Sequence, residues 1–84
     1  MFADRIIKFG NKFYGRLDAG LLQGALDYVA YNEEGLAFEI LCDNICEFDI
    51  SITDEEYQEA VRLIADLGFD LDVGPFKHLV GLRK

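Results

Sequence analysis

The stretch EILCDNICEFDISITDEEY, residues 39–57, decides the fold that this sequence predicts. Its first half carries three carboxylates at intervals of four residues, which a helix places along one edge. Its second half contains Thr53 and Glu56, the T-x-x-E pattern of a capping box at the start of another helix. Residues 48–52 alternate between apolar and polar, but their position between a helix and a cap favours a linker over a strand. The stretch therefore predicts two helices joined by a short link.

The periodic spacing of apolar residues extends the helical pattern over most of the chain. Asp18 and Asn32 are suitable N-caps, and Gly68 is a suitable C-terminal stop. Pro75 can open a short last helix. We predict an all-α fold, a small bundle of four helices plus a short C-terminal helix, with residues 1–84 as a single domain. The predicted helices cover about residues 2–16, 19–31, 33–48 and 54–67, and the last ends near Val80.

Each predicted helix has an apolar face that we expect to form the core. In the second helix, Gly20 and Gly24 are expected to let a neighbouring helix approach closely. The predicted core residues are Phe2, Ile6, Phe9, Phe13 and Leu17 in the first helix, Leu22, Ala25, Leu26 and Val29 in the second, Ala37, Leu41, Ile45 and Phe48 in the third, with Phe38 and Cys42 beside them, and Tyr57, Ala60, Val61, Ile64 and Leu67 in the fourth.

Charge is distributed unevenly along the sequence. The chain has 16 acidic and 8 basic residues, a net charge of −8. Residues 18–72 hold fifteen of the acidic residues and one basic residue, Arg62, a formal charge of −14. Such a surface argues against nucleic acid or an anionic membrane as the ligand, because both are bound by clustered Lys and Arg. It favours a basic protein as the partner.

Four basic residues precede this acidic segment and fall on one side of the first predicted helix, opposite its apolar face. They form either a solvated surface or a contact that eases the repulsion among the acidic helices. The four residues of this basic stripe are Arg5, Lys8, Lys12 and Arg16.

Residues that could support catalysis or bind metal are few. His78 is the one histidine, and Ser51 and Thr53 lie where helix capping explains them. Cys42 and Cys46 are four residues apart on a helix, a poor geometry for a disulfide, and a metal site would need further Cys or His ligands. We expect free thiols that fill space near the core, with a redox role as the alternative. The sequence therefore predicts no enzyme and no cofactor.

The N-terminal sequence MFADRIIKFGNKF has charges within its apolar runs, which is not typical of a signal peptide. No stretch approaches the ~20 apolar residues of a membrane span. We therefore expect a cytoplasmic protein.

The carboxylate ladder of the third predicted helix, Glu39, Asp43 and Glu47, is either a solvated face or a surface for a partner. Like charges four residues apart repel by roughly 0.2–0.5 kcal/mol per pair, and no basic residue lies among these three. Leu36 and Ile40 lie next to the ladder, so this edge is mixed acidic and apolar, as interfaces are.

About half of the chain, roughly residues 26–68, resembles the MafI-type immunity proteins, a family encoded beside polymorphic and contact-dependent bacterial toxins. The resemblance lies in ALDY (25–28), EEGLAFEILCDNICEFDI (33–50) and ITDEEY (52–57), and is weaker in the first helix and in PFKHLVGLRK. It implies a protein that binds and neutralises one cognate toxin domain, often a nuclease and sometimes an EndoU-like RNase. An acidic helical surface could occupy the basic active site of such an RNase.

Exposure and charge then select the residues that we expect to contact the toxin. One alternative is an acidic regulatory binding module, or a nucleic-acid mimic, without a toxin partner. FDISITDEE also resembles acyl carrier proteins, but the position of their prosthetic-group serine falls on Glu34, so we do not expect a carrier. The predicted toxin-binding residues are Glu39, Ile40, Asp43, Glu47, Asp49 and Glu55.

Overall fold

Four α-helices and two 3₁₀-helices form the scaffold of the computed structural model, which describes residues 2–84. No β-strand occurs among those residues, so the predicted all-α bundle of four helices plus a short C-terminal helix is confirmed. No helix within the described range is long and apolar enough to span a bilayer. The helices are α1 (Phe2–Asn11), α2 (Ala19–Asp27), η1 (Tyr28–Tyr31), α3 (Glu34–Glu47), α4 (Asp54–Asp66) and η2 (Phe76–Leu82).

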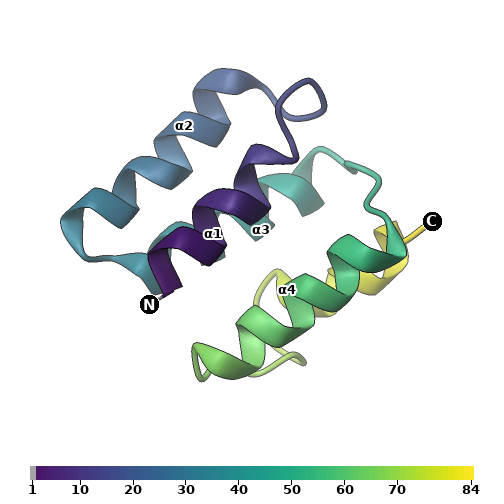
Figure 1. The fold of residues 1–84 in the computed structure, drawn as a ribbon. Coiled ribbons are helices and arrows are strands. Elements are labelled where there is room, and N and C mark those ends of the chain that lie inside the picture. The colour runs from purple at the N-terminus through teal and green to yellow at the C-terminus, as the bar shows by residue number, and fades with distance from the viewer. Residues whose placement is uncertain (1) are drawn as a thin grey trace.

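Helix α3 lies at the centre of the arrangement. It contacts α1, α2, η1 and η2, whereas α4 packs against α1 and η2. Figure 1 shows α1 and α2 side by side in opposite directions, with α3 behind them and the C-terminal segment beside α4. A central position requires a helix that is apolar over most of its circumference, and the sequence of α3 meets this requirement.

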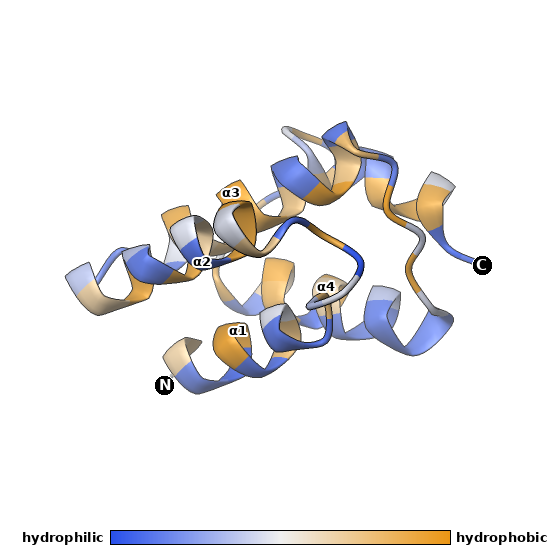
Figure 2. Ribbon diagram, turned by 90° about the horizontal axis from the view of Figure 1, so that it is seen from above, coloured by the Kyte–Doolittle hydropathy of each residue, from blue (hydrophilic) through white to orange (hydrophobic). Residues whose placement is uncertain are grey.

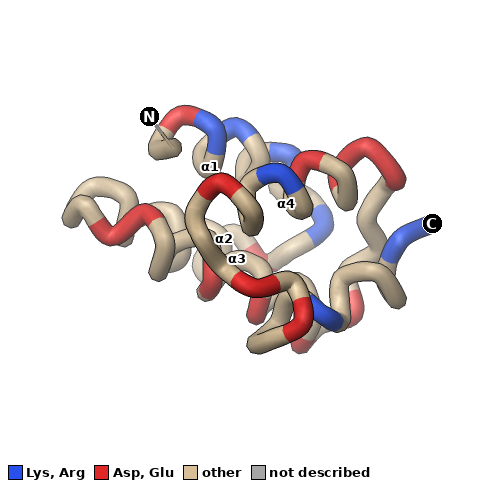
Figure 3. The backbone as a smooth tube through the Cα atoms, turned by 90° about the horizontal axis from the view of Figure 1, so that it is seen from below, with Lys and Arg blue, Asp and Glu red and all other residues tan. Residues whose placement is uncertain are grey.

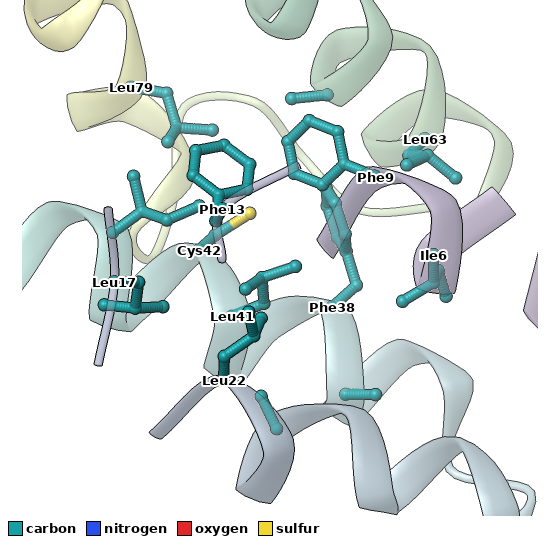
Figure 4. Packing of buried hydrophobic residues seen from close by; sticks show 14 of the residues in the cluster. Ile6, Phe9, Phe13, Leu17, Leu22, Phe38, Leu41, Cys42, Leu63 and Leu79 are labelled. Atoms are coloured by element: carbon teal, nitrogen blue, oxygen red, sulfur yellow. The ribbon is translucent and has the colours of Figure 1, made fainter. Parts of the chain in front are cut away.

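Aromatic side chains hold the middle of the core. Phe9 of α1 and Phe13, which follows α1, meet edge to face, with ring centroids 5.2 Å apart. Phe38 of α3 stacks on Phe76 of η2 at 5.9 Å. Cys42 is fully buried near these rings (Figure 4). Because each aromatic pair contributes about 0.5–1.5 kcal/mol beyond its buried area, these rings tie η2 firmly to α3.

Local sequence patterns define several helix ends as predicted. The Asp18 side chain caps α2 by accepting a hydrogen bond of 3.1 Å from the Leu21 N–H. Thr53 and Glu56 form both bonds of the predicted capping box at the start of α4. Gly68, with a φ of 83°, closes α4 in the left-handed region that glycine favours. Figure 2 shows that polar and apolar residues alternate along α1 and α4.

Other predicted boundaries are wrong. Helix α1 ends at Asn11 instead of residue 16, and the turns that follow include Gly15 at a φ of 90°. The helix predicted over 19–31 tightens into the 3₁₀-helix η1 at Tyr28. Asn32 does not cap α3, because it adopts a left-handed φ of 60° and terminates η1 instead. Glu33 takes the N-cap position of α3 without a side-chain cap bond.

The predicted core is largely confirmed, with one residue wrongly included, one omitted and several that are only partly buried. Phe48 is half exposed, because α3 ends one residue earlier and the chain turns away from the core. Leu63 is fully buried although the prediction omitted it. The predicted core residues that are only partly buried are Phe2, Val29, Tyr57, Val61 and Leu67.

Close helix approach occurs at a different glycine from those predicted. A Cβ on Gly10 would lie 2.9 Å from Leu26 Cδ2, so α1 and α2 meet there. Gly24 has open space around it, and a Cβ on Gly20 would meet only the Asp18 carboxylate. The expected role of Gly20 and Gly24 in helix packing is therefore wrong.

Candidate functional site

The C-terminus of α3 is closed by Asp49, an unusual residue for this task. Asp49 has a left-handed φ of 51°, which L-residues other than Asn and Asp rarely adopt. Its N–H donates to the Cys46 carbonyl (3.2 Å), and the Ile50 N–H donates to the Ile45 carbonyl (3.0 Å). These two bonds form a Schellman motif, which satisfies carbonyls at the helix end and keeps Asp49 beside the last turn of α3.

The chain then passes through Ile52, which fastens the C-terminal segment. The Ile52 N–H donates to the Leu82 carbonyl at 3.0 Å, and the Lys84 N–H donates to the Ile52 carbonyl at 2.9 Å. Phe76 and Leu79 bury the inner side of η2. Helix η2 is thereby held beside the outer edge of α3.

A groove of about 590 Å³ runs between α3 and the η2 segment. Three exposed carboxylates stand on its α3 wall, and its η2 wall is mainly apolar or glycine. Within residues 2–84, none of the three carboxylates forms an ion pair. The groove is lined by Asp43, Cys46, Glu47 and Asp49 from α3 and its closing turn, and by Gly74, Pro75, His78, Gly81 and Leu82 from the η2 side.

The structure brings three of the six predicted toxin-binding residues together: Asp43, Glu47 and Asp49 all line this groove. The other three lie outside its lining. Glu39 is half-buried one turn earlier, and its Oε2 atom is 4.0 Å from the position of a Cβ on Gly74. Ile40 is half-buried against the core, and Glu55 is exposed on the first turn of α4.

The carboxylates of α4 have a different environment, because cations of the same chain reach them. Arg5 Nη1 lies 2.8 Å from Asp66 Oδ2, and Arg16 Nη1 donates to Glu56 Oε1 at 3.1 Å. Two members of the basic stripe therefore ease the repulsion within α4, which was one of its two interpretations. Figure 3 shows the basic positions of α1 gathered at one side of the trace, next to α4. The remaining pairs are Arg5–Glu59, Arg62–Glu59 and Arg83–Asp54.

Burial and pairing shift the ionisation of a few groups. Burial by itself would raise the pKa of Glu56, but hydrogen bonds from Arg16 and Thr53 outweigh it and hold that pKa below its ordinary value. Burial raises the pKa of Cys42 well above that of a free thiol. Burial, together with Asp43 and Asp49, raises the pKa of Cys46 to about 11.

Both cysteines are free thiols, and these pKa values keep them protonated at neutral pH. A protonated thiol is a poor nucleophile and a poor metal ligand. The Cys46 Sγ lies 3.2 Å from the Pro75 carbonyl and donates to it across the floor of the groove. No group of three or more His, Cys, Asp or Glu side chains in the described part of the chain is arranged to hold a metal ion.

Sequence reasoning missed the η2 wall of the groove, including His78, Gly81 and Leu82. The Gly74-Pro75 pair indicated that a helix begins there, but not where it packs. The burial of Phe76 and Leu79 decides that position, and it is a tertiary property. The apolar spacing of these two residues was the one available indication.

No family model matches the chain, and neither a curated protein nor a solved structure matches it significantly.

Proposed function

We propose that this chain is an immunity protein that binds and neutralises a cognate bacterial toxin nuclease domain, with an RNase as the favoured target and the EndoU-like RNases as one candidate class. The observation that carries the proposal is the α3 wall of the groove. Asp43, Glu47 and Asp49 are exposed neighbours without an ion-pair partner among residues 2–84. The resemblance to MafI-type immunity proteins in residues 26–68 supports the same function.

Electrostatics connects this surface to a nuclease. An RNase active site must hold phosphate groups, so it is lined by cations, and a wall of unpaired carboxylates complements it. The carboxylates of the wall repel one another by roughly 0.2–0.5 kcal/mol per pair at helical spacing, and a cationic partner removes this repulsion. The net charge of −8 also attracts such a partner from a distance.

The proposed inhibition is stoichiometric, without catalysis and without a cofactor. Thr53 is occupied in the capping box, and both thiols are protonated. Neither group supplies an activated nucleophile. We propose that the protein acts in the cytoplasm of the cell that makes it, where an incoming toxin reaches its RNA substrate.

Co-expression with the toxin domain encoded next to this gene tests the proposal. The two chains are expected to co-purify, and the nuclease activity of the toxin domain is expected to disappear in the complex. If the protein is a regulatory module without a toxin, one of two results is expected. Either the adjacent domain stays an active nuclease in the presence of this protein, or no adjacent reading frame ends in a small basic domain. Either result would refute the immunity function.

Stopped-flow kinetics of the purified pair gives a second measure. Electrostatic steering is expected to lift the association rate constant from ~10⁵–10⁶ towards ~10⁸ M⁻¹s⁻¹ at low salt, with a steep fall as ionic strength rises. A rate that does not change with salt would contradict the proposed role of the acidic surface.

A further inference from the structure

We infer that the groove between α3 and η2 receives an arginine side chain of the partner protein, together with the backbone that carries it. This inference rests on the proposed function, since the partner is taken to be the toxin domain. It adds the chemical group that is recognised and the place where it binds. A volume of about 590 Å³ accommodates a side chain and a short piece of backbone.

The charge of the groove selects a cation. Three carboxylates stand on its α3 wall, and His78 is the one lining residue that can carry positive charge. Lys77, the neighbour of His78, does not line the groove. A guanidinium presents five N–H donors in a planar fork, so one arginine can bond to two of these carboxylates at once.

The apolar residues of the η2 wall suit the aliphatic part of the same side chain. Pro75 is buried and Leu82 is half-buried, and both line the groove. The Cys46 thiol between the walls is neutral and already donates to the Pro75 carbonyl. The methylene groups of an arginine can therefore pack on the apolar residues of the η2 wall while its charged end meets the carboxylates of the α3 wall.

Gly81 keeps this space open. It is exposed on η2, a Cβ built on it meets no atom within 4 Å, and its φ does not lie in the left-handed region. The fold therefore does not require a glycine at this position, in contrast to Gly10, where a Cβ would lie 2.9 Å from Leu26. Because Gly81 lines the groove, a larger side chain at position 81 would add bulk to the η2 wall without touching the core.

The glycines also supply a matched pair of variants. Gly81→Leu adds a side chain to the η2 wall of the groove, whereas Gly24→Leu adds the same side chain on α2, outside the groove, where a Cβ likewise meets nothing within 4 Å. Both variants are expected to melt at or above the wild-type temperature, because leucine favours a helical backbone more than glycine does. Calorimetric titration with the toxin domain is expected to show roughly tenfold weaker binding, about 1.4 kcal/mol, for Gly81→Leu and no change for Gly24→Leu. Equal binding by Gly81→Leu and wild type would overturn the inference and leave the immunity function standing.

A probe independent of the toxin separates the two proposals. The blocked peptide acetyl-Gly-Arg-Gly-amide is added to the ¹⁵N-labelled protein, with the norleucine peptide acetyl-Gly-Nle-Gly-amide as control. Amide shifts are expected for the arginine peptide alone and at the groove, including Asp43, His78 and Gly81. Asp43→Asn changes an exposed side chain and is expected to reduce these amide shifts. This second variant keeps the test valid even if Gly81→Leu does not fold.

Shifts spread equally over the acidic residues of α4 would show diffuse attraction and refute the groove as a site. Groove binding of the arginine peptide with no binding of the toxin domain would refute the immunity function and keep the groove inference.

Discussion

Helices α3 and α4 are both acidic, but they use their charge differently. The carboxylates of α4 include several that are bound by arginines of the same chain, for example Glu56 by Arg16 and Asp66 by Arg5. Those of the α3 wall, Asp43 and Glu47 among them, meet no cation within the described residues. Acidic residues of this chain therefore fall into two groups: those paired with arginines of the same chain, and those without an ion pair among residues 2–84, which the proposed function assigns to the partner.

Burial sharpens the difference. Glu56 is only 6% exposed, so its charge is held in a site that water hardly reaches and its partners decide its ionisation. The ladder carboxylates Asp43 and Glu47 lie on the surface, where the loss of one charge changes the fold little. Substitutions in the two helices should therefore separate stability from binding.

The largest effect is expected from reversing the charges of α3. Asp43→Lys with Glu47→Lys replaces attraction by repulsion at a cationic partner, and a truncated buried charge pair alone costs about 2–5 kcal/mol. Protection of cells against the toxin should be lost, while the helical circular dichroism and melting temperature stay nearly unchanged.

The matched control is Lys8→Glu with Lys12→Glu. These two lysines of the basic stripe have no ion pair among residues 2–84, so the variant should still protect cells against the toxin. Full protection by the α3 variant, together with failure of the α1 variant, would place the interface on the opposite side of the molecule.

On α4 the same kind of change should affect stability instead. Glu56→Ala removes the capping-box bond to the Thr53 N–H and leaves Arg16 without its carboxylate. We expect a loss of about 2–3 kcal/mol in the free energy of unfolding, measured by urea denaturation, with unchanged affinity for the toxin. The adjacent control Glu55→Ala changes an exposed carboxylate and should cost less than about 1 kcal/mol. If Glu55→Ala and Glu56→Ala lowered the free energy of unfolding equally, the paired carboxylate would stabilise the fold no more than the free one.

Acid should reveal the same pairing with a smaller effect. Because the pKa of Glu56 is lowered in the folded state, the unfolded chain binds its proton first as the pH falls. The stability that Glu56 contributes is thus fully present above the carboxyl pKa of the unfolded chain, about 4.3, and is lost as the pH falls towards the folded value. Urea midpoints measured as the pH falls from about 7 to below this unfolded-state value should decrease less for Glu56→Gln than for the wild type. An identical slope for both proteins would show that Glu56 titrates normally.

The division between α3 and α4 also explains which parts of the structure the sequence could predict. The capping box of Thr53 and the stop at Gly68 depend on residues within one turn, so local patterns were sufficient. The Arg16–Glu56 pair joins residues 40 positions apart, and its existence depends on where the turns after α1 lie relative to α4. The η2 wall of the groove depends in the same way on the burial of Phe76. Local chemistry thus predicts the free carboxylates of α3, whereas the shape of their site is tertiary.

The smallest expected effect concerns Asp49, which belongs to both sides of the comparison because it ends a helix and lines the groove. Asp49→Gly removes the cost of a left-handed L-residue, about 1–2 kcal/mol, but increases the entropy of the unfolded chain, which costs about 0.5–1 kcal/mol, so a small net stabilisation should appear as a raised urea midpoint. The same change deletes one carboxylate at the end of the groove, so toxin association should slow modestly at low salt. Asp49→Asn separates the two roles, since Asn tolerates the left-handed region but carries no charge. It should slow association as much as glycine does without the gain in stability. If Asp49→Gly destabilised the protein, the Asp49 side chain would have a structural role that outweighs its backbone strain, and Asp49 would belong with the stabilising carboxylates of α4.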